Sequence, residues 1–107
     1  MKSKPPKHYR RIKKAQPDFI AAWDAIGKAV RDTGPLPPKT GHLIQLAAAA
    51  AVRSEGAVHS HVRRLIALKA KPAEIRQAIM LTAATIGFPA VMAALSWAED
   101  ILGGRKD

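Results

Sequence analysis

Two histidines stand two positions apart in the stretch RSEGAVHSHVRR, residues 53 to 64, and they are the first candidates for chemistry. If this stretch is helical, two positions correspond to a rotation of about 200° around the helix axis, so His59 and His61 point in different directions. A regular helix therefore cannot bring both imidazoles onto one metal ion. No metal site is expected from this pair, and each histidine is considered by itself.

His61 falls on the apolar face of the expected helix, and Ser54 lies on the same side. The other members of that face are Ala57, Val58, Val62, Leu65 and Leu68. Burial there would favour the neutral imidazole, which can accept a proton. Spacing alone favours a core histidine that is satisfied by a backbone carbonyl, and a general acid or base is the alternative.

The other two candidates have more ordinary interpretations from spacing. His59 lies four positions from Glu55 and from Arg63, so a surface ion pair with Glu55 is expected. His42 stands near the polar start of an earlier helix, where a solvated or capping residue is the default. Ser54 is suited to cap the helix that carries both later histidines.

The charge distribution separates a basic N-terminal arm from the rest of the chain, whose net charge is +10. Seven lysines and arginines precede the first acidic residue, Asp18, whereas the remainder balances eleven Lys and Arg against eight Asp and Glu. The arm, residues 1–15, has too few apolar residues to fold alone, so a solvated, flexible tail is favoured. A segment that contacts nucleic acid or another anionic partner is the alternative.

The remainder, residues 16–104, is expected to form one compact all-α domain of about five or six helices. The chain has 107 residues, of which 48% are hydrophobic but only 5% aromatic, so closely approaching helices with aliphatic side chains must build the core. Cysteine is absent, which excludes disulfides, thiolate metal sites and cysteine nucleophiles and is typical of a cytoplasmic protein. No apolar segment follows the basic start, so no export signal is expected.

Helix signals recur along this domain. Pro17 and Asp18 suit a first turn, and apolar residues then repeat at helical spacing up to Gly34. Further helices are expected over 39–52, from Glu55 onwards, from Pro72, and from Pro89 to about Leu102.

The longest uncharged stretch, residues 79 to 98, has the length of a membrane span. Gly87, Phe88 and Pro89 interrupt it near the middle, so two short buried helices around a turn are the better prediction. Because one small domain can hardly cover so much apolar surface, burial against sister subunits is expected.

The segment HVRRLIALKA, the PAEI helix start that follows it and the later turn and helix IGFPAVMAAL resemble the carboxymuconolactone decarboxylase and alkylhydroperoxidase-D-like family. The resemblance covers roughly residues 17 to 102. It implies an all-helical, alkylhydroperoxidase-D-like fold. It also implies trimers or hexamers with sites near subunit contacts.

Peroxidases of this family carry a Cys-x-x-Cys pair, with a histidine four positions after the second cysteine and a glutamate twelve before the first. If His61 is that histidine, Ser54 and Ala57 stand at the cysteine positions and His42 replaces the glutamate. A serine hydroxyl cannot cycle through sulfenic acid and disulfide, so peroxidase activity is not expected. Lys69 stands where family members often carry the glycine that ends a helix.

The decarboxylase branch lacks the cysteine pair and keeps the histidine, so the resemblance implies a cofactor-independent lyase that acts on a small acidic or carbonyl compound. His61 would be the general acid or base, with His42 as its partner and Ser54 as a hydrogen-bonding group. The candidates for holding a substrate carboxylate are His59, Arg63 and Arg64.

Two other classes of function stay open. One is a non-catalytic ligand-binding or structural oligomer of the same family, and the other is nucleic-acid or anionic-partner binding through the basic arm. A metal site formed by His42, His59 and His61 is a weaker idea. The expected partners are a small-molecule substrate and other copies of the chain, with no cofactor and no membrane.

Overall fold

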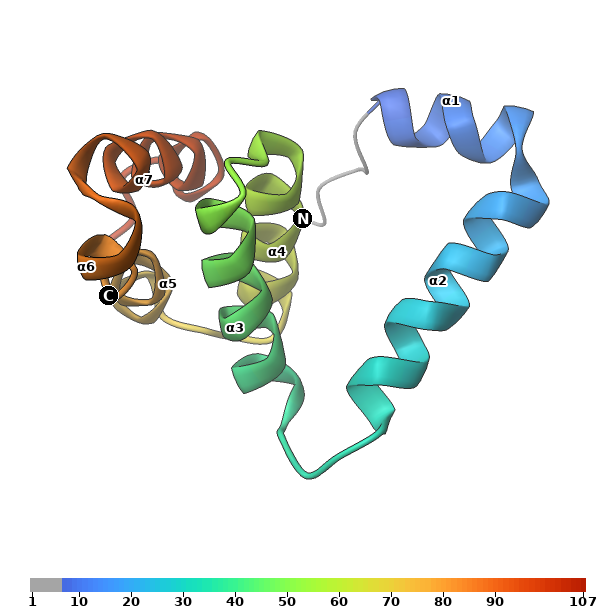
Figure 1. Cartoon of the computed structure of the whole chain (residues 1–107), viewed down its shortest axis with the longest axis horizontal. Coiled ribbons are helices and arrows are strands. Elements are labelled where there is room, and N and C mark those ends of the chain that lie inside the picture. The colour runs from blue at the N-terminus through green and yellow to red at the C-terminus, as the bar shows by residue number, and fades with distance from the viewer. Residues whose placement is uncertain (1–6) are drawn as a thin grey trace. The chain divides into compact units, whose positions relative to one another are not determined.

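The computed structural model describes residues 7–107, which form helices and no strand, so the all-α prediction is confirmed. Contacts divide the chain into two units, residues 1–36 and residues 37–107. The first unit holds α1 (Lys7–Ala15) and α2 (Pro17–Asp32) (Figure 1). The second holds α3 (Pro38–Ala51), α4 (Glu55–Ala67), α5 (Pro72–Met80), α6 (Ala83–Ile86) and α7 (Phe88–Leu102).

The first unit contains a helix within the segment that was expected to be a flexible arm. Residues 7–15 form α1, whose lysines, arginines and terminal alanine are good helix formers, while residues 1–6 lie outside the described part of the chain. Pro17 occupies the first turn of α2, where its missing N–H costs nothing. The Tyr9 hydroxyl donates to Asp24 over 3.1 Å, which ties α1 to α2. The unit boundary therefore falls at the proline-rich connection near Pro37 rather than near residue 15.

The second unit is built around the packing of α3 against α4, with α7 beside α4 and α5 beside both α3 and α7 (Figure 1). Alanines of α3 and α7 are buried and let the helix backbones approach closely. The largest fully buried side chains are Leu46, Leu65, Ile75, Ile79, Leu102, Val58 and Val62. The helical face predicted from the α4 sequence thus faces the core, except that Leu68 at its end is 38% exposed.

Two non-glycine residues adopt the left-handed conformation where helices end. Arg53 follows α3 with φ of 58°, and Lys69 follows α4 with φ of 66°. At Lys69 the Ala70 N–H donates to the Leu65 carbonyl over 2.9 Å and the Lys69 N–H to the Ile66 carbonyl over 3.0 Å, the two bonds of a Schellman motif. The position that the family resemblance assigned to a glycine therefore has a glycine-like backbone.

The uncharged run over residues 79 to 98 is interrupted where the sequence predicted. Gly87 has φ of 87° and separates the single turn of α6 from α7. The run is only half covered within one chain, since Leu81 and Phe88 are 72% and 73% exposed while Ile79 and Ala94 are fully buried. Over residues 7–107, every helix is too short or too polar to cross a bilayer.

Candidate acid/base site

The packing of α3 on α4 brings two histidines into contact. His42 lies one turn into α3, on the face that also carries Leu46, and it is the one buried polar side chain among the described residues, with 5% exposure. His61 lies in the middle of α4 and is half-buried. Their Nδ1 atoms are 3.1 Å apart, and their ring centroids are separated by 5.3 Å with the planes tilted by 43°.

This contact requires the two imidazoles to differ. At 3.1 Å one Nδ1 donates a proton to the other, so one ring carries its hydrogen on Nδ1 and the other presents a lone pair there. If both rings were imidazolium, both Nδ1 atoms would carry a hydrogen and neither could accept a hydrogen bond. The two positive charges would also repel each other, so this contact would be lost. The pair is therefore equipped to hold one proton between the rings and to pass it on.

Ser54 lies at the start of α4 and caps it. Its Oγ accepts a hydrogen bond from the Ala57 N–H over 3.2 Å, which confirms the predicted N-cap. The hydroxyl hydrogen can still be donated elsewhere, so the cap leaves room for a hydrogen-bonding role as well. Ser54 falls on the same side of α4 as His61 by helical rotation.

His59 lies on the other flank of α4. Its Nε2 contacts the Asp100 carboxylate of α7 over 2.9 Å, while Glu55 is close enough for the three ligand atoms to lie within 4.8 Å of one another. Glu55, the expected partner of His59, is nearby, but the residue in direct contact is Asp100. Asp100 is on another helix, so helical spacing within α4 could not predict this contact. These three side chains could bind a divalent cation, although both carboxylates are exposed.

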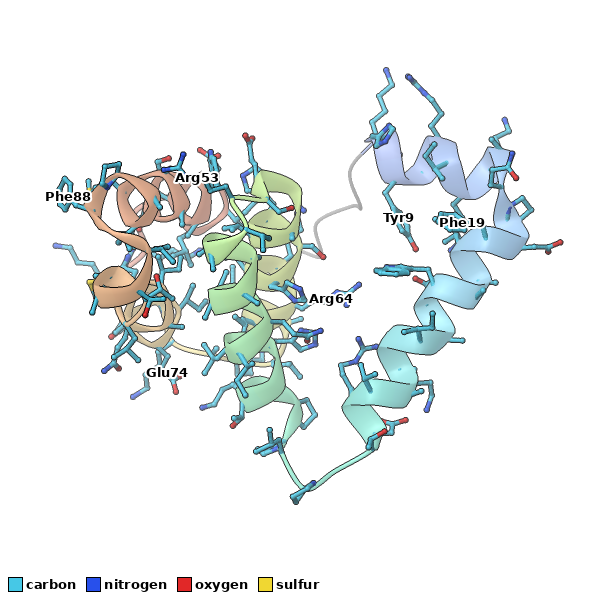
Figure 2. All side chains as sticks on the ribbon, in the orientation of Figure 1. Tyr9, Phe19, Arg53, Arg64, Glu74 and Phe88 are labelled. Atoms are coloured by element: carbon cyan, nitrogen blue, oxygen red, sulfur yellow. The ribbon has the colours of Figure 1, made fainter. Side chains whose placement is uncertain are left out.

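The two arginine candidates separate in the same way. Arg64 is three positions after His61, and Figure 2 shows its side chain projecting from α4 on the side away from α6 and α7. Arg63 is four positions after His59 and is half-buried. Its Nη1 is enclosed and meets no hydrogen-bond acceptor among residues 7–107. The predicted site residues thus form two groups, with His42, His61 and Arg64 in one and His59 and Arg63 in the other.

The comparison with known proteins decides the family. Residues 17–100, which span α2 to most of α7 and include both contacting histidines, match the carboxymuconolactone decarboxylase family. The chain belongs to this family. A crystal structure of a carboxymuconolactone decarboxylase family protein from Legionella pneumophila has the same fold, with a TM-score of 0.78 and 24% sequence identity over 90% of this chain and 86% of that one. No curated protein sequence matches the chain.

Among carboxymuconolactone decarboxylase family proteins, this one has no cysteine at all, in agreement with the sequence analysis. Of the two positions that the resemblance sets against the redox cysteines, Ser54 caps α4 and Ala57 supplies the N–H for that cap. His42 lies against His61. The side chains at these positions are therefore two imidazoles, a hydroxyl and a methyl group.

Gln45 was not a candidate in the sequence analysis. It lies three positions after His42 on α3, and its Oε1 is enclosed without a hydrogen-bond donor in the described part of the chain. A buried acceptor of this kind costs free energy unless something donates to it. The i,i+3 spacing from His42 is the signal that could have identified Gln45.

A separate open groove of about 570 Å³ lies between α3, α5 and α6. Its lining is mostly apolar and does not include His42 or His61. Glu74 lies at its edge, where the Lys71 N–H and the Lys39 ammonium, the latter 3.0 Å away, lower the pKa of its carboxyl. With its one acidic side chain already paired, the groove offers little for catalysis. The lining residues are Thr40, Leu43, Ile44, Ala47, Ala48, Ala51, Glu74, Gln77, Ala78, Leu81, Thr82, Thr85 and Ile86.

Proposed function

We propose that this protein is a cofactor-independent acid/base enzyme of the lyase type, which acts on a small acidic or carbonyl compound. The observation that carries the proposal is the 3.1 Å contact between the Nδ1 atoms of His42 and His61. Two imidazoles that share one proton, one buried and one half-buried, can deliver or accept it without a metal or a redox group. Family membership supports the same class of reaction, and the absence of cysteine disfavours the peroxidase class.

The proposed step is the replacement of a carboxylate by hydrogen. The bond between carbon and carboxylate breaks, carbon dioxide leaves, and the electron pair stays on a carbon whose charge is delocalised onto a neighbouring carbonyl group. The His61 imidazolium then protonates that carbon, and His42 accepts or returns the hydrogen bond as the charge on His61 changes. Solvent restores the proton to His61, so atoms and charges balance without a co-reactant.

The remaining roles follow from position. Ser54 caps α4 and can donate its hydroxyl hydrogen to a substrate oxygen. Arg64 lies on the His61 flank and is the better candidate to hold a substrate carboxylate. His59 already contacts a carboxylate of the chain, and Arg63 accompanies it, so we assign both a supporting part. We expect the enzyme to work as a homo-oligomer, a trimer or hexamer.

The test is release of carbon dioxide from a panel of small carboxylic acids, with carboxymuconolactone first. His61→Ala should abolish turnover and leave the helical circular dichroism spectrum unchanged, while His42→Ala should lower kcat at least tenfold. His8→Ala in α1 is the matched control and should keep full activity. Full turnover by His61→Ala would refute the proposal. Absence of turnover from the whole panel would favour the non-catalytic ligand-binding or structural alternative.

One observation favours a second candidate function, the binding of nucleic acid. Helix α1 presents Lys7, Arg10, Arg11 and Lys14 at i, i+3, i+4 and i+7 spacing, and all four are exposed. This spacing places the four cations on one face of the helix, where they could follow a run of phosphates. The binding would be electrostatic and indifferent to sequence.

A further inference from the structure

Three side chains that can ligate a metal ion meet where α4 packs against α7 (Figure 1). Glu55 and His59 stand one turn apart on α4, and the Asp100 carboxylate of α7 contacts His59. One ligand atom from each side chain lies within 4.8 Å of the other two. We call Glu55, His59 and Asp100 the α4–α7 cluster. Since forty-one positions separate His59 from Asp100, the cluster exists only because the two helices pack together.

The geometry of the α4–α7 cluster is close to that of a three-ligand zinc site. The i,i+4 spacing of Glu55 and His59 puts both side chains on one face of α4, the spacing by which a helix supplies two ligands to one ion. Tetrahedral coordination with bonds of about 2.0–2.2 Å places two ligand atoms about 3.3–3.6 Å apart. The His59 and Asp100 ligand atoms, at 2.9 Å, therefore need only separate slightly. The exposed Glu55 side chain can rotate to close the third side.

The cluster already holds its imidazole in place and leaves oxygen ligands unused. The His59 side chain is only 18% exposed and contacts one oxygen of Asp100, so the ring loses little freedom when an ion binds. The other Asp100 oxygen and the Glu55 carboxylate accept no hydrogen bond from residues 7–107. The positive end of α4 favours an acidic residue at position 55. That preference does not account for the imidazole and the second carboxylate beside it.

The ligand atoms select the class of ion. An imidazole nitrogen favours Zn²⁺ and its first-row neighbours over Mg²⁺ and Ca²⁺, which prefer oxygen ligands. Zn²⁺ has no geometric preference of its own, so it suits three protein ligands with water in the fourth position. The two carboxylates balance the charge of the ion, whereas the guanidinium of Arg63, one turn after His59, opposes its binding in part.

We propose that Glu55, His59 and Asp100 bind one Zn²⁺ ion, with water completing the coordination, and that this ion joins α4 to α7. His61 points in another direction from α4 by helical rotation, so the ion takes no part in the proton transfer at the histidine pair. The zinc site therefore does not depend on the lyase proposal. Because the ion binds the folded chain, it stabilises the unit of residues 37–107 by mass action.

The test is calorimetric titration of ZnCl₂ into the full-length protein after treatment with a chelator. We expect one Zn²⁺ to bind per chain with micromolar affinity, without competition from a thousandfold excess of Mg²⁺, and to raise the Tm until chelator is added. Glu55→Gln and Asp100→Asn preserve side-chain shape and should each weaken zinc binding at least tenfold. Glu99→Gln, next to Asp100 but paired with Arg76, is the matched control and should change the affinity less than twofold, as should His61→Ala.

Each other result would overturn the site. Unchanged affinity in Glu55→Gln or in Asp100→Asn would remove that carboxylate from the coordination. Zinc binding that is lost in His61→Ala and kept in Glu55→Gln would place the ion on the histidine pair instead. Absence of saturable binding, or several ions per chain that no single variant affects, would leave only nonspecific attachment to the surface. Anomalous diffraction at the zinc edge, from crystals grown with ZnCl₂, should show one peak between Glu55, His59 and Asp100.

Discussion

The Nδ1 atom of His42 lies 3.1 Å from the Nδ1 atom of His61, although nineteen positions separate the two residues in sequence. This distance fixes a chemical asymmetry between two side chains of the same type. One ring must donate at Nδ1 and the other must accept there. The two rings therefore share one Nδ1 hydrogen between them.

We predict opposite tautomers for these two histidines. Nitrogen-15 spectra of the ring nitrogens, recorded at a pH where the rings are neutral, should show one of them protonated at Nδ1 and the other at Nε2. Signals are assigned by comparison with His42→Ala and His61→Ala. Two Nε2-protonated rings would contradict the contact, because two lone pairs would then face each other.

The neighbouring arginines offer a matched pair for testing substrate binding. By helical spacing, Arg64 lies on the His61 flank of α4, three positions after that histidine, and Arg63 lies on the His59 flank, four positions after that one. Arg64→Gln should raise KM for a carboxylate substrate at least tenfold with a smaller change in kcat, because a carboxylate contact would be lost. Arg63→Gln should change KM by less than threefold. The reverse ranking would move the substrate to the His59 side.

Much of this fold follows from local signals, since Pro17, Ser54, Pro72 and Gly87 each mark a helix boundary where the structure has one. The α1 helix was missed because basic residues dominate this segment, and its two large apolar residues, Tyr9 and Ile12, are too few to predict a buried helical face, although they stand at helical spacing.

The site was predictable only in part. Helical rotation correctly separated His59 from His61, yet it could not reveal that His42 meets His61 or that Asp100 meets His59. Both contacts join different helices, and their geometry depends on how α3, α4 and α7 pack. A single sequence carries the periodicity of each helix, while the distances between helices depend on the fit of many side chains at once.

Lys69 provides a test of backbone strain. Its φ of 66° is natural for glycine but costs other residues about 1–2 kcal/mol, part of which is offset by the flexibility that glycine adds to the unfolded chain. Lys69→Gly should therefore raise the free energy of unfolding by about 1 kcal/mol in urea titrations at fixed protein concentration. Lys69→Ala keeps the Cβ and should bring no such gain. Equal stabilities of both variants would contradict this account.

The ion pair between Arg76 and Glu99 predicts a loss of stability in acid. The Arg76 guanidinium donates to Glu99 over 2.6 Å and holds the pKa of that carboxyl below its usual value of 4.5, with a further contribution from the Gly104 N–H. A lowered pKa stabilises the fold at pH values above about 4.5, and this contribution is lost as the pH falls through the folded-state pKa. Glu99→Gln should flatten the acid side of the stability profile.

A variant of Arg76, the cation of the same ion pair, serves as the control for Glu99→Gln. Arg76→Gln should flatten the acid limb of the profile in the same way, because the shift of the Glu99 pKa originates mainly from this side chain. The double variant should then lose less stability than the two single variants together. An acid limb that stays as steep in Glu99→Gln as in the unsubstituted protein would assign the acid sensitivity to other carboxyls.

The cationic face of α1 predicts how DNA binding would depend on salt. Each phosphate neutralised on duplex DNA contributes a slope of about −0.9 to log K against log salt concentration. Replacing Lys7, Arg10, Arg11 and Lys14 by glutamine should therefore flatten that slope by about 3 to 4 in fluorescence anisotropy titrations with a short duplex. Deletion of residues 2–14 should flatten it at least as much.

Net charge alone must be separated from the arrangement of these four cations. Replacing Arg53, Lys69, Arg105 and Lys106, which are all exposed, by glutamine removes the same number of positive charges from elsewhere on the chain. If α1 is the binding surface, this second variant keeps most of the slope, because its residues do not share one helical face. If both variants lose the same amount of slope, overall charge rather than the α1 face explains the binding. If the intact protein is not retained on DNA even at low salt, nucleic acid is not a partner.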